Sequence, residues 1–329
     1  MKKVLLLFGG NSSEHLISCL SAKSIYENID KKKFSVTLVG VDFDNEWYVF
    51  NDLLDYLKEG NWKTSANKEK IHNIISYLKG YDVVFPIIHG KNGEDGKLQG
   101  MLEMFEIPYV GCNLISSALG MDKAFTKIIF EHLGIPQIPY KVIKSKKDLS
   151  IKFEYPVIVK PSNGGSSIGI TKVNKKKDLK KAIDEAFKYD SKVIIEKFIR
   201  AQELECAVLH DGKFISSSIG EILPANEFYD YDAKYNNSLS KTIVPANIDH
   251  SLAEQIKNIS EKAFLGIDGY GFSRIDFLYD LDNNNLYLNE INTIPGFTSI
   301  SMYPKLFEYD GISYKDLITK LIMSGIKKR

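Results

Sequence analysis

The sequence predicts an α/β N-terminal domain with a parallel sheet, followed by two α+β domains. In the first third of the chain, short apolar runs alternate with longer helical patterns, which is typical of a parallel sheet. From residue 155 onward, apolar runs come in closely spaced pairs, which is typical of antiparallel hairpins. The length of 329 residues is sufficient for two or three domains, each with its own core.

The N-terminal domain is expected to contain buried parallel strands. The run KVLLLF is apolar without alternation, as expected for a strand that is covered on both faces. A glycine turn, GGNSSEH, follows it and leads into a helical run at 16–29. The expected strands of this sheet lie at residues 3–8, 34–42 and 81–90.

Two helical patterns, at 95–111 and 116–136, follow this domain. Gly134 and Pro136 would end the second helix, because neither residue favours continuation. The strands expected beyond this point are antiparallel pairs, namely 156–161 with 167–173, 203–210 with 213–222, and 274–280 with 286–292.

Composition and charge exclude several classes of protein. The formal net charge is +1, so the chain has no basic excess and no nucleic-acid partner is expected. No apolar stretch reaches the length of a membrane span, and the first apolar run is too short for a signal peptide. Cys19, Cys112 and Cys206 are far apart, which argues against a disulfide framework or a zinc site and favours the cytoplasm.

The C-terminal hairpin raises the possibility of a metal site. If Asp276 pairs with Glu290, the same register pairs Arg274 with Asn292, and all four side chains share one face. Carboxylates directly opposite each other destabilise a sheet unless something offsets their repulsion. Arg274 can offset part of it, and the carboxylate and amide oxygens also suit Mg²⁺. The alternative is a surface hairpin in another register.

Two loops of the N-terminal domain are candidate ligand sites. The turn GGNSSEH precedes a helix, where anionic groups bind favourably. Glu14 in this turn would hold the ammonium group of a small zwitterion, or alternatively form a near capping box with Asn11 as the N-cap. The second loop, HGKNGEDGKLQG, begins where a parallel strand ends and carries His89 and Glu94 among glycines. Its alternative interpretation is a flexible turn with a capping acid.

Two stretches of the later domains are candidate nucleotide-binding segments. In VKPSNGGSSIGI, Lys160 supplies a positive charge, and the backbone N–H groups at 164–167 can face phosphates. The alternative there is a loose hairpin loop. In VIIEKFIRAQELE, an extended backbone could bind an adenine edge while Glu203 contacts ribose hydroxyls. A charged strand end is the alternative for this second stretch.

Taken in order, these stretches closely resemble D-alanine–D-alanine ligases of the ATP-grasp superfamily. The matching pieces span nearly the whole chain with the family's spacing: GGNSSEHLIS, HGKNGEDGKLQG, SALGMDK, VKPSNGGSSIG, IIEKF, EFYDYDAKY, GFSRIDF and NEINTIPGFTS. The resemblance implies an ATP-grasp fold with three domains. It places a substrate-binding domain at 1–111, a central domain at 112–195, and a C-terminal domain with a lid, the ω-loop, and the metal site at 196–329.

The resemblance also implies a reaction. ATP would phosphorylate one D-alanine, and the amine of a second would attack the D-alanyl phosphate, giving D-alanyl-D-alanine for peptidoglycan precursors. The alternatives are a D-alanine–D-serine ligase of the vancomycin-resistance type and a non-catalytic ATP-binding regulatory protein. The intact set of charged residues argues against the non-catalytic alternative. Homologous ligases are commonly homodimers, so a homodimer is expected.

Site roles follow from the resemblance, position by position. The implied metal ligands for two Mg²⁺ (or Mn²⁺) are Asp276, Glu290 and Asn292. The implied ATP-binding residues are Lys123, Lys160, Ser167, Glu196, Lys197, Ile199, Glu203 and Lys234. The implied D-alanine-binding residues are Glu14, His89, Ser301 and Met302. The implied catalytic residues are Glu14, Ser166 and Tyr235, which would form a hydrogen-bonded triad, together with Arg274 and the backbone N–H of Gly296.

Overall fold

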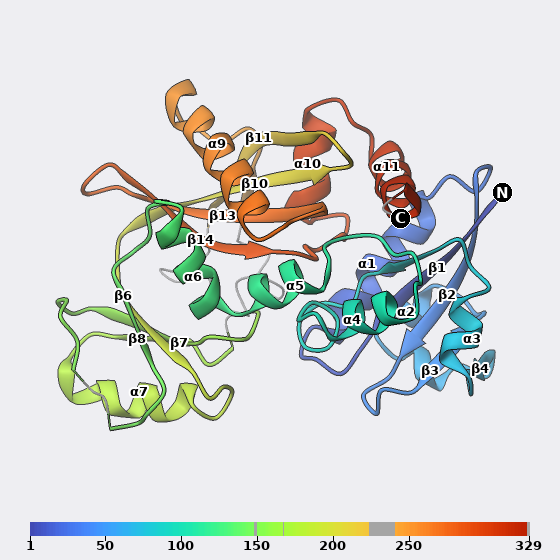
Figure 1. Cartoon of the computed structure of the whole chain (residues 1–329), viewed down its shortest axis with the longest axis horizontal. Coiled ribbons are helices and arrows are strands. Elements are labelled where there is room, and N and C mark those ends of the chain that lie inside the picture. Colours follow the sequence, from blue (N-terminus) through green and yellow to red (C-terminus); the bar gives the residue numbers. More distant parts are fainter. Residues whose placement is uncertain (148–149, 167, 224–240, 328–329) are drawn as a thin grey trace.

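The computed structural model describes residues 1–147, 150–166, 168–223 and 241–327. Within this part of the chain, the strands form three sheets. Figure 1 shows the N-terminal sheet in blue on the right, the central sheet in green at lower left, and the C-terminal sheet in yellow to red above and between them.

The N-terminal sheet is parallel where the sequence predicts it to be. Strand β1 pairs in parallel with β2 and β5, whereas β3 and β4 add an antiparallel edge. The sheet has the order β4-β3-β2-β1-β5, with the bounds β1 (Lys2–Gly9), β2 (Phe34–Val41), β3 (Trp47–Phe50), β4 (Lys68–Lys70) and β5 (Val83–Pro86). The helical segments of this domain are α1 (His15–Asn28), α2 (Asp55–Lys58), η1 (Trp62–Thr64), α3 (Ile74–Leu78) and α4 (Lys97–Met104).

The position of strand β1 between two cores explains why its sequence is apolar without alternation. Successive side chains point to opposite faces of a sheet. Leu6 and Phe8 therefore enter one core together with α1, while Leu5 and Leu7 enter a second core with α3 and α4. Both faces are covered, so every side chain from Val4 to Phe8 is buried.

Two helical predictions need correction. The helix expected at 95–111 is shorter, because Glu106 takes a left-handed conformation with φ 56° and the chain then forms a bridge between Tyr109 and Val84. The helix expected at 116–136 is two helices, α5 (Leu114–Met121) and α6 (Lys123–His132). Asp122 separates them, since its side chain accepts hydrogen bonds from the first backbone N–H groups of α6 and caps that helix.

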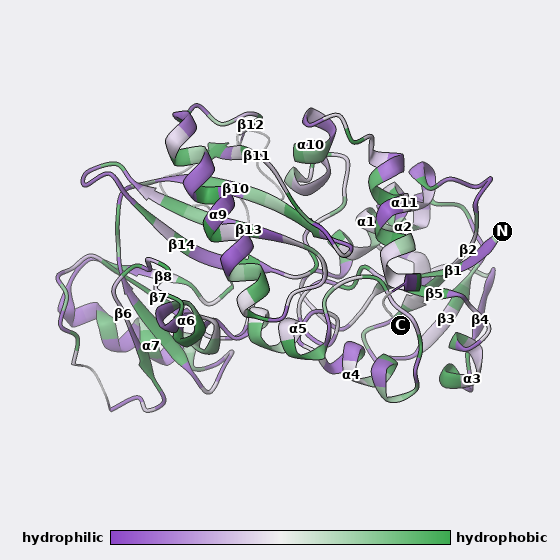
Figure 2. Cartoon of the chain, turned by 45° about the horizontal axis from the view of Figure 1, so that its top comes forward, coloured by the Kyte–Doolittle hydropathy of each residue, from purple (hydrophilic) through white to green (hydrophobic). Residues whose placement is uncertain are grey.

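The central sheet is antiparallel and has α7 against one face. Its order is β6-β9-β7-β8, with the bounds β6 (Tyr140–Ile143), β7 (Val157–Pro161), β8 (Thr171–Val173) and β9 (Val193–Lys197). The short helix η2 (Lys176–Asp178) leads into α7 (Leu179–Ala186), whose Leu179 and Ile183 pack against Val157 and Val193. Figure 2 shows α7 with both hydrophobic and hydrophilic residues, as expected for a helix that covers a sheet on one side only.

The C-terminal sheet lies between two layers of helices. Its order is β12-β11-β10-β13-β14, with the bounds β10 (Ala201–His210), β11 (Phe214–Leu223), β12 (Lys241–Ile243), β13 (Gly271–Asp280) and β14 (Asn285–Asn292). Helix α9 (His250–Gly266) covers one face through Ile256 and Phe264. Helix α10 (Met302–Tyr309) covers the other face, and α11 (Tyr314–Lys327) packs against β13, β5 and α1.

A shared core fixes the N-terminal sheet against the C-terminal sheet. Phe85 of β5 contacts Phe272 of β13 and Phe297 of the following loop, with ring centroids 6.3 and 6.2 Å apart. Tyr303 of α10 packs on the same rings. This shared core therefore keeps the loop after β5 close to the loop after β14.

None of the helices in the described ranges combines the length and the apolar character that crossing a bilayer requires. All three cysteines are buried thiols.

Candidate active site

A cavity of about 1280 Å³ lies where the loops of the three sheets meet. Every predicted site residue that the structure describes lines it: Glu14, His89, Lys123, Lys160, Ser166, Glu196, Lys197, Ile199, Glu203, Arg274, Asp276, Glu290, Asn292, Gly296, Ser301 and Met302. The remaining predicted residues, Ser167, Lys234 and Tyr235, lie outside the described residues.

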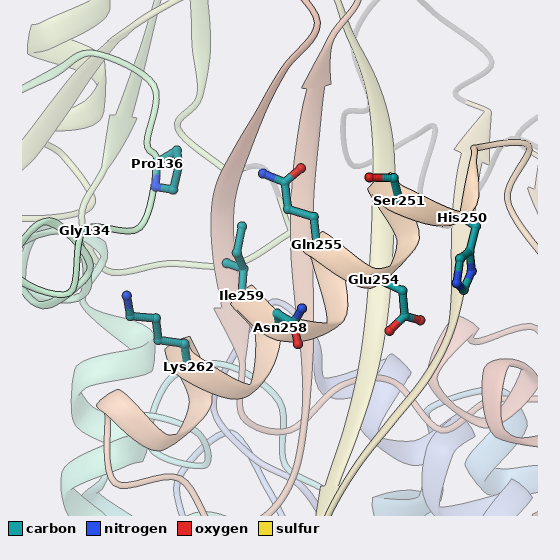
Figure 3. A pocket seen from close by; sticks show the side chains of 9 residues that line it. All are labelled: Gly134, Pro136, His250, Ser251, Glu254, Gln255, Asn258, Ile259 and Lys262. Atoms are coloured by element: carbon teal, nitrogen blue, oxygen red, sulfur yellow. The ribbon is translucent and has the colours of Figure 1, made fainter.

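A second, more open hollow of about 730 Å³ lies beside α9 (Figure 3). Its side chains come from one face of α9, with Gly134 and Pro136 opposite. It contains none of the residues that the sequence singles out for chemistry, so the large cavity is the candidate active site.

The C-terminal hairpin has the predicted register. Arg274 lies opposite Asn292, and Asp276 lies opposite Glu290, with an irregularity in the pairing only beyond Asp276. The Arg274 guanidinium donates to both oxygens of Asp276, at 2.7 and 2.8 Å, and the Asn292 amide donates to Asp276 at 2.9 Å. The repulsion expected between the opposed carboxylates is therefore offset by Arg274.

Glu205 completes the surroundings of Arg274, and sequence reasoning missed it. It lies opposite Asp276 on the neighbouring strand β10, and its carboxylate is 3.1 Å from Arg274 Nε. Burial by itself lowers the pKa of Arg274, but the Asp276 and Glu205 carboxylates raise it well above its usual value. Arg274 is thus a permanent cation at the cavity wall. The signal available in the sequence was the spacing from Glu203, which puts both side chains on one face of the strand.

Lys123 connects three parts of the cavity wall. It begins α6, its ammonium group lies 3.3 Å from Glu290, and it donates to the carbonyl oxygen of Gly164 at 2.8 Å. The hairpin and the glycine loop after β7 are therefore bridged by one cation. Such a group is placed to neutralise an anion that enters between them.

Another part of the cavity wall holds a buried cluster of three charged side chains, Glu196, Lys160 and Lys127. Glu196 of β9 lies 2.7 Å from both Lys160 and Lys127. Burial alone would raise the pKa of Glu196, but the two ammonium groups lower it to about 2. Sequence reasoning missed Lys127, although its position four residues after Lys123 puts both lysines on one face of α6.

Glu14 lies where three loops converge. Its carboxylate accepts a hydrogen bond from the Ser166 hydroxyl at 2.7 Å. A Cβ atom added at Gly90 or at Gly165 would lie only 2.8 Å from its other oxygen. Glycines in these two loops therefore allow the backbone to approach this carboxylate closely.

The capping box proposed for Asn11 is wrong. Helix α1 begins at His15 with Glu14 as its N-cap, and the Glu14 side chain does not cap the helix. Ser12 instead accepts from the Glu14 backbone N–H at 3.2 Å and donates to the carbonyl oxygen of His89 at 2.9 Å. Since α1 starts three residues later than that box requires, the carboxylate of Glu14 faces the cavity.

The loop after β14 brings the last predicted residues to the cavity. Ser301 Oγ accepts from the Thr298 backbone N–H at 2.9 Å, and a Cβ atom at Gly296 would lie 2.8 Å from that hydroxyl oxygen. No residue in the described part of the chain accepts a hydrogen bond from the Gly296 N–H. This N–H and the Ser301 region are therefore close neighbours at the cavity wall.

A parallel-sheet domain joined to two antiparallel sheets, with a cation-rich cavity between them, defines an ATP-grasp protein, and this confirms the predicted fold class. Family models for the N-terminus and the C-terminus of D-ala D-ala ligase match residues 3–112 and 129–323. The chain belongs to the D-alanine–D-alanine ligase family.

Individual relatives match over nearly their whole length. A D-alanine–D-alanine ligase of Acetivibrio thermocellus is 45% identical, over 99% of this chain and 96% of that protein. Among solved structures, the VanG D-Ala:D-Ser ligase from Enterococcus faecalis has a TM-score of 0.89 and 36% identity, over 98% of this chain and 99% of that chain. The D-alanine–D-alanine ligase from Coxiella burnetii has a TM-score of 0.83 and 31% identity, over 99% and 94%.

Proposed function

We propose that this protein uses ATP to join two D-alanine molecules into D-alanyl-D-alanine, through a D-alanyl phosphate, for the synthesis of peptidoglycan precursors. The observation that carries the proposal is that every described residue with an expected role lines one cavity, in a chain that belongs to the ligase family throughout its length. We assign substrate binding to residues 1–111, and the ATP-grasp domains to 112–195 and 196–329. A cytoplasmic homodimer remains our expectation for the assembly.

ATP would lie between the central and C-terminal sheets. Lys123 and Lys160 supply positive charge for its phosphates, and the backbone N–H groups of the loop at 164–166 are close by. The extended segment that follows Glu196 would bind adenine, with Glu203 at the ribose. Ser167 and Lys234 keep the ATP-binding roles expected for them.

The hairpin residues fit a hard metal ion. Asp276 and Glu290 contribute carboxylate oxygens and Asn292 an amide oxygen, and all three line the same wall of the cavity. In the described residues no three His, Cys, Asp or Glu side chains form a metal cluster by themselves, so the amide is needed to complete the set. Two Mg²⁺ (or Mn²⁺) bound here would neutralise the phosphate charge during phosphoryl transfer.

The first D-alanine would bind next to Glu14. The carboxylate of Glu14 would accept hydrogen bonds from the ammonium group of this D-alanine. The Ser166 hydroxyl, which donates to Glu14 Oε1, orients that carboxylate. Tyr235 would complete the triad from the lid. This arrangement leaves the substrate carboxylate to face the lysines and attack the terminal phosphorus of ATP. An O–P bond forms, the bond from that phosphorus to the oxygen bridging the β- and γ-phosphates breaks, and ADP leaves with the electron pair.

The second step forms the peptide bond. The amine of the second D-alanine, held by Ser301 and Met302 through its carboxylate, attacks the acyl carbon. A C–N bond forms, and the electron pair of the carbonyl moves onto oxygen. Arg274 and the Gly296 N–H stabilise this oxyanion. Collapse of the intermediate breaks the C–O bond to phosphate, and the amine loses a proton.

One specific observation favours a second candidate, a ligase that accepts D-serine as its second substrate. The VanG D-Ala:D-Ser ligase superposes closely on this chain. The curated relatives named D-alanine–D-alanine ligase are more similar in sequence, however, at up to 45% identity against 36%. We therefore keep D-alanine as the second substrate.

The test is phosphate release from ATP and Mg²⁺ by the purified protein with D-alanine alone, then with D-serine or D-lactate added at equal concentration. Products are identified by mass. We expect D-alanyl-D-alanine as the main product in each mixture. Dominant D-alanyl-D-serine would replace the proposal with the second candidate, dominant D-alanyl-D-lactate would reject both candidates, and the absence of any product would reject the ligase activity.

A substitution at Gly165 tests the role of Glu14. In Gly165→Ala, the new methyl group would lie 2.8 Å from Glu14 Oε2 and push the carboxylate away from the substrate ammonium. We expect the KM for D-alanine to rise about tenfold, which corresponds to about 1.4 kcal/mol of binding energy. Steady-state kinetics at saturating ATP measures it.

A double-mutant cycle provides the control for this effect. In a Glu14→Ala background the methyl group has room, so Gly165→Ala should then change the KM little. Equal effects of Gly165→Ala in both backgrounds would contradict the idea that it acts through Glu14.

A further inference from the structure

The loop that carries Gly296 is held by side chains of the N-terminal domain. The backbone N–H of Ile294 donates to Glu94 Oε1 at 2.9 Å, and the carbonyl oxygen of the same residue accepts from His89 Nδ1 at 2.9 Å. Both polar groups of one peptide residue are thus bound by two side chains of the loop at 89–94. These partners are 200 and 205 residues away along the chain.

A second contact holds the other end of the same loop. The backbone N–H of Phe297 donates to Ser21 Oγ at 3.2 Å, and that hydroxyl lies 3.1 Å from His89 Nε2. Pro295 and Gly296 are therefore bracketed by contacts to residues of α1 and of the loop after β5. Phe297 is fully buried against the shared aromatic core, which leaves the bracketed backbone little freedom.

The hydrogen bonds define one consistent arrangement of protons. His89 Nδ1 must carry a proton, because its partner is a carbonyl oxygen. In the neutral ring Nε2 is then an acceptor, so Ser21 donates to it and can still accept from Phe297. Burial lowers the pKa of His89, which favours this neutral form.

The other carboxylate oxygen of Glu94 forms a hydrogen bond within its own loop, at 89–94. Glu94 Oε2 accepts from the backbone N–H of Gly90 at 3.1 Å, and the side chain is almost completely buried. One carboxylate therefore connects two backbone N–H groups from different domains. A buried carboxylate with two such donors has a fixed orientation and transmits the position of one loop to the other.

We propose that Glu94, His89 and Ser21 form a clamp that positions the Gly296 N–H for the oxyanion of the peptide-forming step. They are positioning residues, since each acts through the backbone of Ile294 or Phe297. The inference rests on the proposed function, because Gly296 matters to the reaction only in a ligase. It explains why these polar groups are buried at the contact between two domains.

The effect on the reaction follows from geometry. A group that stabilises the transition state loses much of its effect when it moves by about 1 Å, and such a displacement can reduce the rate about 100-fold. Glu94→Gln keeps the volume but replaces one acceptor oxygen by an N–H₂ group, which faces either Gly90 or Ile294 with the wrong polarity. Ser21→Ala removes the hydroxyl that joins Phe297 to His89.

The experiment compares these two variants with Ser18→Ala in the full-length protein. Ser18 is also buried on α1, one turn before Ser21, but its hydroxyl bonds Gly9 and Ile87 of the N-terminal domain and, among the described residues, makes no contact to the loop that carries Gly296. We expect kcat for D-alanyl-D-alanine synthesis to fall about tenfold or more in Glu94→Gln and Ser21→Ala, with the KM for ATP within about twofold. Ser18→Ala should lose stability without that selective loss of kcat.

Amide hydrogen exchange gives a readout that does not depend on activity. The peptide containing Ile294 and Phe297 should exchange faster in Glu94→Gln and Ser21→Ala than in the wild type, and Ser18→Ala should leave it unchanged. Unchanged exchange in the first two variants, or a kcat within about twofold of wild type, would overturn the clamp. If the wild type makes no dipeptide, the proposed ligase function fails, and the exchange data still decide whether the clamp exists.

Discussion

Replacing Arg274 with methionine is expected to reduce kcat about 100- to 1000-fold, the usual cost of removing one oxyanion donor. The same change should lower the free energy of unfolding by about 3–5 kcal/mol, because it leaves a buried ion cluster without its cation. Arg274 lies 2.7 Å from Asp276 and 3.1 Å from Glu205, and its side chain is only 20% exposed. Steady-state kinetics and urea unfolding measure the two effects.

A second substitution separates the two effects of Arg274→Met. Adding Glu205→Gln removes one of the carboxylates that lost its partner, so part of the lost stability should return. Turnover should stay low, because the guanidinium that we propose as a partner of the oxyanion is still missing. Recovery of kcat together with stability would mean that Arg274 acts only as a structural cation.

The second large effect is expected for Glu290→Gln. The amide keeps the volume but loses the charge that a divalent cation needs, so kcat should fall by about 1000-fold at ordinary Mg²⁺ concentrations. Stability should change by less than about 1 kcal/mol, since the side chain is 23% exposed and its cationic partner, Lys123, is 3.3 Å away. Kinetics over a range of Mg²⁺ or Mn²⁺ concentrations measures the change.

Asp282→Asn serves as the matched control for Glu290→Gln. Asp282 lies in the turn of the same hairpin and pairs with Arg200 at the surface, with 55% of its side chain exposed. Its replacement should leave kcat and the metal dependence unchanged. Near-normal turnover in Glu290→Gln, or an equal loss in both variants, would refute the metal assignment.

The hairpin illustrates what local sequence can predict. Strands β13 and β14 are separated by four turn residues, and a short turn leaves few ways to pair the flanking strands. The turn sets a register in which Phe277 lies opposite Leu288, and that register alone would place Asp276 opposite Asn289. The pairing of Asp276 with Glu290 depends in addition on the irregularity between Asp276 and Phe277, which shifts the register by one residue. The fully apolar run of β1 predicted a strand buried on both faces for an equally local reason.

Local patterns failed where a nearby side chain changes the backbone. The apolar periodicity continues through Asp122, but the carboxylate there caps the next helix and breaks the pattern into α5 and α6. Helix α1 begins within one residue of its predicted start, but a short polar side chain also decides its cap, because Ser12 bonds the Glu14 backbone and Asn11 does not cap the helix. Both sites involve short polar side chains that bond to neighbouring backbone groups.

The sequence by itself determined most of the strands and helices, the C-terminal hairpin, and, through its motifs, which loops are expected to carry the chemistry. Only the tertiary structure decided that Lys127 and Lys160 share Glu196, and that Glu94 bonds a peptide 200 residues away. Periodicity encodes which face of an element is buried, but not which element will cover it. That partner is selected when Phe85, Phe272 and Phe297 pack together and bring the distant loops into contact.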